Sequence, residues 1–225
     1  MKEKVIVAWS GGKDSALALY ETLGSGRYEV LSLLTTVSEG FDRISIHGVR
    51  RVLLEQQAKA LAIPLDVTFI SKGASDEEYE HELLKALKNN RSSSVSSVVF
   101  GDIFLEDIRE YREYILAEAG LDGIFPLWKK DTHALAHRVI NLGFKAIITS
   151  VDAIVLGKDF AGRAYDERFL AALPANVDPC GENGEFHSFV HDGPIFHRNV
   201  SFTKGETMLR QNRFFSCDLL PKKEI

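Results

Sequence analysis

The sequence is poor in cysteine and contains no long apolar run. Its 225 residues include only two cysteines, Cys180 and Cys217, too few for a disulfide framework, so we expect reduced thiols in a cytoplasmic protein. No uncharged apolar stretch reaches the roughly 18 residues that a membrane-spanning helix needs. No signal peptide is recognisable at the N-terminus either. The composition therefore predicts no membrane partner.

Clusters of basic residues and internal repeats are also lacking. The 27 lysines and arginines are outnumbered by 32 acidic residues, which gives a net charge of −5. Proteins whose main partner is a nucleic acid usually carry a basic patch, so RNA or DNA is not the expected partner. An apolar share of 45 % and a charged share of 26 % are ordinary for a soluble globular protein of this length.

What the chain does contain is a glycine-rich turn near its start. An apolar run at 5–8 predicts a buried strand, and residues 16–20, rich in alanine and leucine, predict a helix. Glycines let main-chain N–H groups converge on an anion, and a helix N-terminus adds the positive end of its dipole. Ser10 and Ser15 add hydroxyl groups and Lys13 a positive charge. The turn is therefore predicted to bind phosphate.

Two widespread phosphate-binding patterns do not fit this turn. Walker A requires serine or threonine after the lysine, whereas Asp14 follows Lys13; the dinucleotide pattern requires spaced glycines, whereas Gly11 and Gly12 are adjacent. The sequence S-G-G-K-D-S instead resembles the S-G-G-x-D-S loop of ATP pyrophosphatases. Those enzymes cleave ATP into AMP and pyrophosphate. The alternative is a turn that binds nothing, but six specified positions between a strand and a helix favour the nucleotide site.

The remaining pattern alternates strands with helices, which predicts a doubly wound, mostly parallel α/β sheet of five to six strands with a Rossmann-like layout. Ligands bind such sheets at the carboxyl ends of the strands, where Ser10, Thr36, Asp102 and residues 126–128 are expected. Strands are predicted at 29–37, 65–70, 97–102, 123–126 and 145–151, and helices at 14–23, 49–62, from 76 onward, 105–119 and 132–142, with a solvent loop at 89–94.

The character of the chain changes near residue 152. We expect a nucleotide-binding domain at 1–151 and a smaller α+β domain at 152–225. The second domain is predicted to hold a short helix at 166–173 and strands at 186–190 and 195–202. The last dozen or so residues, which include Arg210 and Arg213, are either an edge strand or a loose tail, and whether 203–225 belongs to the core stays open.

A second informative stretch, P-C-G-E-N-G-E-F-H-S, occupies residues 179–188. Its glycines permit a tight loop, whose N–H groups and carboxylates can surround a small polar ligand or a magnesium ion. An acidic turn that leads into a hairpin explains the same residues. From the residues alone both interpretations stay open.

Together, S-G-G-K-D-S, G-D-I at 101–103, P-L-W at 126–128 and C-G-E-N-G-E-F-H-S at 180–188 resemble the ATP-binding diphthamide synthetase family, best known for diphthine–ammonia ligases. The resemblance covers roughly residues 5–196. It implies an adenine nucleotide alpha hydrolase-like fold, with ATP and Mg²⁺ as cofactors. It also implies an amide ligase that adenylates a substrate carboxylate and transfers it to ammonia or an amine. A homodimer is one option for the oligomeric state.

The chain departs from the ligase pattern E-G-G-E-[YF]-E-[ST] in this late segment. Asn183 replaces a glycine and His187 replaces a carboxylate. A neutral or cationic imidazole changes the charge that a substrate meets, and diphthine carries a quaternary ammonium group. The form E-N-G-E-F-H resembles a bacterial branch of the family connected with cobamide salvage. We therefore expect the shared chemistry and leave the substrate open.

The predicted site has three groups of residues. Catalysis is assigned to Lys13, Asp14 and Glu185, and Asp14 is also the expected magnesium ligand, with Asp102 as a further candidate for magnesium or the ribose. The nucleotide-binding set is Ser10, Gly11, Gly12, Lys13, Asp14, Ser15, Thr36, His47, Gly101 and Asp102; the substrate-binding set is Trp128, Glu182, Asn183, Gly184, Glu185, His187 and Ser188.

Two other functions remain as alternatives. A tRNA-modifying ATP pyrophosphatase predicts a basic patch and reactive cysteines, and a nucleotide-binding module predicts ATP or AMP binding without turnover. His133 and His137 have a spacing that zinc sites use, but no third ligand is evident near them, so an ordinary helix surface is expected. His187 and His191 lie on one face of the predicted strand, where metal binding is the less expected alternative.

Overall fold

The computed structural model describes residues 2–39, 43–44, 48–92 and 94–222. Its first half is built on a parallel sheet with the strand order β4-β2-β1-β5-β6. A short segment, β3 (Arg43–Ile44), adds an antiparallel pairing at the end of β2. The parallel strands are β1 (Glu3–Ala8), β2 (Tyr28–Ser38), β4 (Leu65–Ile70), β5 (Ser97–Val99) and β6 (Asp122–Ile124).

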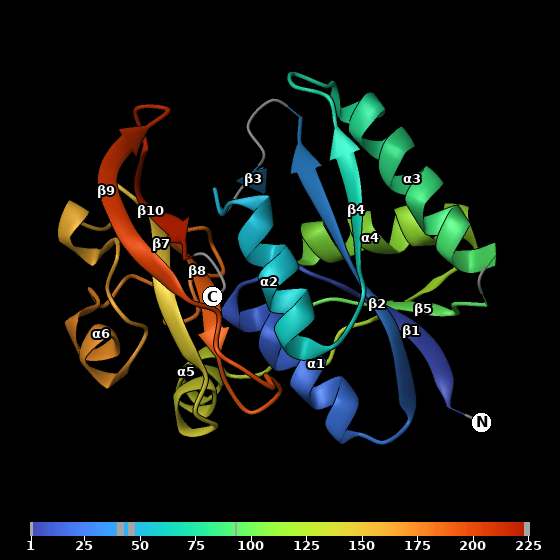
Figure 1. Ribbon diagram of the computed structural model, residues 1–225, viewed down its shortest axis with the longest axis horizontal. Helices are drawn as coiled ribbons and strands as arrows, with labels where there is room; N and C mark the ends of the chain where they lie inside the picture. Colours follow the sequence, from blue (N-terminus) through green and yellow to red (C-terminus); the bar gives the residue numbers. More distant parts are fainter. Residues whose placement is uncertain (1, 40–42, 45–47, 93, 223–225) are drawn as a thin grey trace.

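Helices cover both faces of this sheet (Figure 1). Side chains alternate along β1, so Val5 and Val7 join the core that includes α1 and α2, while Ile6 joins the core of α3 and α4. Strands buried on both faces need apolar residues on both, as the run at 5–8 has. The α/β class is confirmed. The helices are α1 (Lys13–Gly24), α2 (Arg51–Leu61), α3 (Asp76–Ser92) and α4 (Glu106–Ala119).

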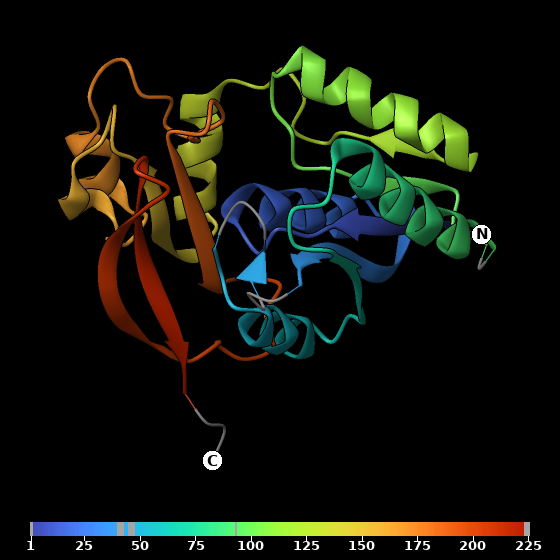
Figure 2. The same ribbon diagram turned by 90° about the horizontal axis from the view of Figure 1, so that it is seen from above.

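The last third of the chain forms a separate antiparallel sheet with the order β8-β7-β10-β9 (Figure 2). Its strands are β7 (Lys145–Asp152), β8 (Phe186–Asp192), β9 (Phe202–Arg210) and β10 (Phe214–Pro221). The helices α5 (Thr132–Asn141) and α6 (Glu167–Ala172) and the 3₁₀ turn η1 (Lys158–Phe160) accompany it.

Four expectations about elements need correction. The strand predicted at 145–151 exists, but it pairs with β8 and β10, so it belongs to the second sheet. Residues 195–201 are not a strand, because β9 begins only at Phe202. The polar segment 89–94 is not a loop throughout, since α3 continues to Ser92. At the end of the described residues, β10 lies between β7 and β9 and is therefore neither an edge strand nor a loose tail.

The two sheets are joined through α1 and α2, which lie between them (Figure 1). Asp218 on β10 accepts hydrogen bonds from Arg43 at 3.0 Å and from Arg50 at 2.6 Å. The main-chain N–H of His197 donates to the carbonyl of Ala60 on α2 at 2.8 Å. These contacts fix the second sheet against one face of the first. None of the helices in the described part of the chain is long and apolar enough to cross a membrane.

Candidate active site

The glycine-rich turn, which we call the phosphate loop (residues 10–15), connects the end of β1 to the start of α1. β1 and β5 are neighbours in the sheet, but the chain continues from β1 to β2 on one side and from β5 to β6 on the other side. Such switch points open a crevice at the carboxyl ends of two neighbouring strands. Gly101, which follows β5, packs so closely on α1 that a Cβ there would lie 2.7 Å from the carbonyl carbon of Asp14. The phosphate loop therefore lies where α/β sheets bind ligands.

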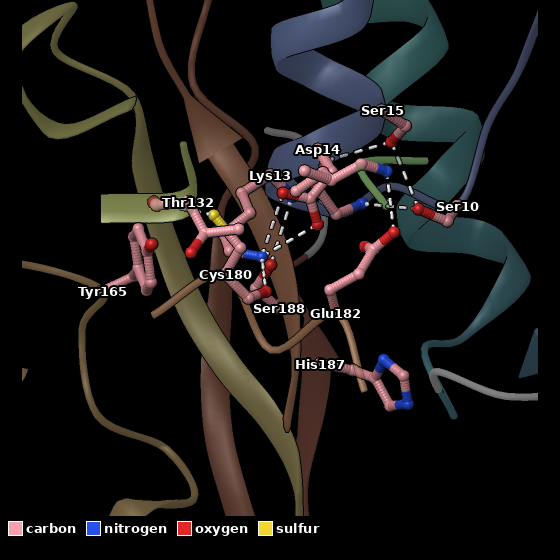
Figure 3. Close-up of polar contacts among 12 residues, drawn as sticks. Ser10, Lys13, Asp14, Ser15, Thr132, Tyr165, Cys180, Glu182, His187 and Ser188 are labelled. Carbon is pink, nitrogen blue, oxygen red and sulfur yellow. Dashed lines mark hydrogen bonds and ion pairs between the residues drawn. The ribbon is translucent and has the colours of Figure 1, made fainter. Parts of the chain in front are cut away.

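Hydroxyl groups and main-chain amides converge in the phosphate loop (Figure 3). The Ser10 and Ser15 hydroxyls are 3.2 Å apart, and the N–H of Gly12 donates to the Ser10 hydroxyl at 3.3 Å. The Ser15 hydroxyl donates to the Gly12 carbonyl at 3.0 Å. Because Gly12 precedes α1, these donors stand at the positive end of the helix dipole. The geometry suits an anion.

Lys13 directs its side chain into the second half of the molecule (Figure 3). Its ammonium group contacts the Asp14 carboxylate at 2.8 Å and donates to the carbonyl oxygen of Cys180. The rings of Tyr165 and Phe186 lie 5.5 Å and 5.2 Å from the same nitrogen, within cation–π distance. Burial alone would lower the pKa of Lys13, but Asp14, Cys180 and Glu182 together hold that pKa above the ordinary value. Lys13 is therefore a buried, charged link between the two halves.

Residues 178–186, which we call the acidic loop, are held in shape by hydrogen bonds to side chains of the same loop. Glu185 Oε1 accepts hydrogen bonds from the Asp178 main chain and the Asn183 amide, both at 3.0 Å. Gly181 has a φ of +69°, and a Cβ there would lie 2.8 Å from the Phe186 carbonyl oxygen. Glu185 Oε2 is buried and, among the described residues, has no hydrogen-bond partner. This oxygen is a buried acceptor that is available to a ligand proton.

Glu182 ties the acidic loop to the first sheet. Its Oε1 accepts from the main-chain N–H of Ile103 at 2.7 Å and of Phe104 at 3.3 Å, just beyond β5. Burial raises the pKa of Glu182 to about 7, although these two N–H groups favour the charged form.

Strand β8 lies along the phosphate loop. The Ser188 hydroxyl accepts from the main-chain N–H of Lys13 at 3.1 Å, and the N–H of Val190 donates to the Gly11 carbonyl at 2.9 Å. Burial, together with the nearby Lys13 charge, lowers the pKa of His187 to about 4. The imidazole that replaces a carboxylate of the ligase pattern is thus neutral at physiological pH.

The other predicted site residues are less directly placed. Asp102 forms a two-point ion pair with Arg112, at 2.7 Å and 3.0 Å, and Trp128 packs against Arg109, whose guanidinium lies 4.7 Å from the ring centre. Thr36 is half-buried near the carboxyl end of β2. His47 lies outside the described residues. The loop residues, Glu182 and Ser188 are therefore the members that direct contacts bring together.

Sequence analysis did not identify Gln57, Tyr165 or Asp178. Gln57 is completely buried and hydrogen-bonds the phosphate loop through the Gly11 carbonyl. The sequence could have indicated this burial, because residues 53, 57 and 61 lie on one face of a predicted helix and the residues at 53 and 61 are leucines. Tyr165 and Asp178 lie in irregular segments without a pattern, and nothing in the sequence marks them.

The histidines and cysteines do not form a metal centre in the described part of the chain, where no three His, Cys, Asp or Glu side chains are grouped for one. His137 pairs with Glu167 at 3.0 Å. The Cys180 thiol donates to the Thr132 carbonyl, and burial raises its pKa. A thiol in this state is a poor nucleophile, which does not favour sulfur transfer.

Comparisons with known proteins agree with the architecture. The family model "Diphthamide synthase N-terminal domain" matches residues 3–123, and "Diphthamide synthase C-terminal domain" matches residues 131–218. The chain is 27 % identical to the diphthine–ammonia ligase of Danio rerio, covering 95 % of this chain and 91 % of that protein. It is 24 % identical to that of Homo sapiens, covering 95 % and 88 %. A match to the Schizosaccharomyces pombe protein is 27 % identical and covers 91 % of this chain but only 37 % of that longer protein. The chain belongs to the diphthamide synthase family.

Proposed function

We propose that this protein is an ATP-dependent ligase that adenylates a substrate carboxylate and joins it to ammonia or an amine. The observation that carries the proposal is the contact between the phosphate loop and β8, in which Ser188 accepts from the Lys13 main chain at 3.1 Å. This contact holds the phosphate loop against β8, which supports a nucleotide site and a second polar site beside one another. The name of the relatives, diphthine–ammonia ligase, supports carbon–nitrogen bond formation.

The first step takes place on the phosphate loop. The phosphates of ATP lie on the N–H groups at the start of α1 and on the Ser10 and Ser15 hydroxyls. An oxygen of the substrate carboxylate attacks the α-phosphorus, the α–β bond breaks, and pyrophosphate leaves with the bonding electrons. Lys13 keeps its hydrogen bonds to Asp14 and to the Cys180 carbonyl, and its positive charge offsets the negative charge of the phosphates.

The phosphate loop offers one carboxylate, that of Asp14, to a magnesium ion. Mg²⁺ is usually held by one or two carboxylates together with substrate phosphates, and Asp14 supplies a half-buried carboxylate within the phosphate loop. Asp14 would hold the ion, which would supply charge neutralisation on the phosphates.

The second step belongs to the acidic loop. The nitrogen of ammonia attacks the acyl carbon of the adenylate, and AMP leaves. The nitrogen then carries one proton too many, and Glu185 Oε2, the buried oxygen without a partner in the described structure, accepts it. Asn183 and Glu182 shape the loop that holds the acceptor.

The acceptor itself has two candidates. Diphthine is the one that the relatives' name suggests. A small carboxylate of cobamide salvage is the second, and the neutral His187 supports it, because a quaternary ammonium group would meet one negative charge fewer than in the ligase pattern.

One assay tests the reaction class. The protein is incubated with ATP, Mg²⁺, ¹⁵N-ammonium and a pool of cellular metabolites, and the nucleotide product is separated by chromatography. We expect AMP, pyrophosphate and a ¹⁵N-labelled amide detected by mass spectrometry. ADP and phosphate would overturn adenylation, whereas ATP binding without any turnover would leave a nucleotide-binding module.

A further inference from the structure

Gln57 on α2 contacts three groups that surround the phosphate loop. Its Nε2 lies 3.0 Å from the Gly11 carbonyl oxygen and 2.5 Å from the Val190 carbonyl oxygen, and its Oε1 accepts from the Trp9 indole at 2.9 Å. An indole N–H only donates and a carbonyl only accepts, so these partners determine which end of the carboxamide is which. The side chain is 0 % exposed, so every polar atom of this amide is satisfied without water.

The Gly11–Gly12 peptide is the unit that Gln57 holds. In a planar trans peptide the carbonyl of one residue and the N–H of the next point in opposite directions. The Gly11 carbonyl points to Gln57 and Val190, and the Gly12 N–H accordingly points to the Ser10 hydroxyl at 3.3 Å. The orientation of that N–H is therefore set from the opposite side of the peptide.

A peptide between two glycines has little steric preference of its own. Gly11 already has a φ of +75°, and neither glycine has a Cβ to oppose rotation. If the peptide turned over, a carbonyl oxygen would replace an N–H in the anion site and would repel phosphate. The close approach also explains why Gly11 is a glycine, since a Cβ there would lie 2.7 Å from Gln57 Oε1.

We propose that Gln57 is a positioning residue that keeps the Gly11–Gly12 peptide in the orientation that binds phosphate. The proposal rests on the proposed function, because it assigns phosphate to this loop. Gln57 acts through Gly12 and is not in contact with the substrate. Since it donates to Val190 as well, it also keeps β8 in register with the loop.

The test compares two substitutions that each remove part of the same hydrogen-bond set. Gln57→Met keeps the length of the side chain but removes both donated bonds. Trp9→Phe, the matched control, removes the bond that the carboxamide accepts and leaves the two that it donates. Binding of inorganic pyrophosphate, ATP and adenosine is measured by titration calorimetry with magnesium, and folding by circular dichroism.

We expect Gln57→Met to weaken pyrophosphate and ATP binding about tenfold, the size of one hydrogen bond to a charged group, with adenosine binding unchanged. Trp9→Phe should lower stability with all three affinities retained. Equal loss for adenosine and pyrophosphate would show a merely structural role and overturn the inference, as would unchanged binding. If Gln57→Met does not fold, Gln57→Asn carries the test, because its shorter side chain withdraws the carboxamide from the Gly11 and Val190 carbonyls and adds no charge. A wild-type protein that binds neither ATP nor pyrophosphate would overturn the proposed function itself.

Discussion

The side-chain nitrogen of Lys13 donates a hydrogen bond to the main-chain oxygen of Cys180, a residue 167 positions away in the sequence. The same nitrogen contacts the Asp14 carboxylate at 2.8 Å. One cation of the phosphate loop therefore also holds the start of the acidic loop. Changes at Lys13 should be felt in both.

Replacing Lys13 by methionine should abolish AMP formation. The substitution leaves Asp14 without its counter-charge and releases the Cys180 carbonyl, and we expect a loss of stability of about 1–3 kcal/mol, because Asp14 is only half-buried. Product formation is followed with the assay above, and stability by denaturant unfolding.

Arg213→Met is the matched control for this experiment. Arg213 pairs with Asp152 at 2.8 Å in the second sheet, away from the phosphate loop. It should cost stability and retain AMP formation. If Lys13→Met behaves in the same way, Lys13 has no part in the reaction.

Glu185→Gln should remove activity and preserve the fold. The amide retains an oxygen to accept from Asp178 and Asn183, so the acidic loop keeps its shape, but it cannot accept a proton at the second position. We expect the rate of amide formation to fall at least about a hundredfold, the lower range for loss of a general base. Full activity in this variant would assign the loop a structural role only.

Ser188→Ala tests the contact between β8 and the phosphate loop. It removes the acceptor of the Lys13 main-chain N–H and leaves this buried donor without a partner. We therefore expect the free energy of unfolding to fall by about 1 kcal/mol and ATP to bind more weakly. Ser216→Ala removes a hydroxyl from β10 that is 3.4 Å from Ser150 and should leave ATP affinity unchanged. Equal affinities in the two variants would contradict the role given to Ser188.

Glu182 should make stability depend on pH in the neutral range. Its pKa rises from 4.5 to about 7 on burial, so between these values the folded protein binds more protons than the unfolded chain. The free energy of unfolding contributed by this group therefore falls as pH rises through that window.

The measurement compares wild type and Glu182→Gln by denaturant unfolding across the window. The variant should have a free energy of unfolding that falls less with pH than that of the wild type. Glu118→Gln, an equal change of charge on the exposed face of α4, should follow the wild type. Identical curves for wild type and Glu182→Gln would contradict the assignment.

The sequence was sufficient to predict the first sheet and its loop. Apolar runs such as residues 5–8 and the helical spacing of residues 49–62 are local signals, and the structure contains a strand or helix at each. The two adjacent glycines predicted a turn between β1 and α1, and Gly12 indeed precedes α1 directly.

Pairings between distant segments could not be predicted in this way. The apolar run at 145–151 has the composition of a parallel core strand, and only its partners β8 and β10 place it in the other sheet. The same limit applies to Glu182, whose carboxylate accepts hydrogen bonds from the main-chain N–H groups of residues 103 and 104. A main-chain N–H leaves no trace in the amino-acid sequence.

The hydrogen bond from the main-chain N–H of Lys13 to the Ser188 hydroxyl spans 175 residues, so its two partners are synthesised at different times. During translation the phosphate loop emerges 175 residues before the residue of β8 that contacts it. A nascent chain therefore presents a glycine turn without its second side. The nucleotide site that we propose would therefore be complete only after β8 has been synthesised.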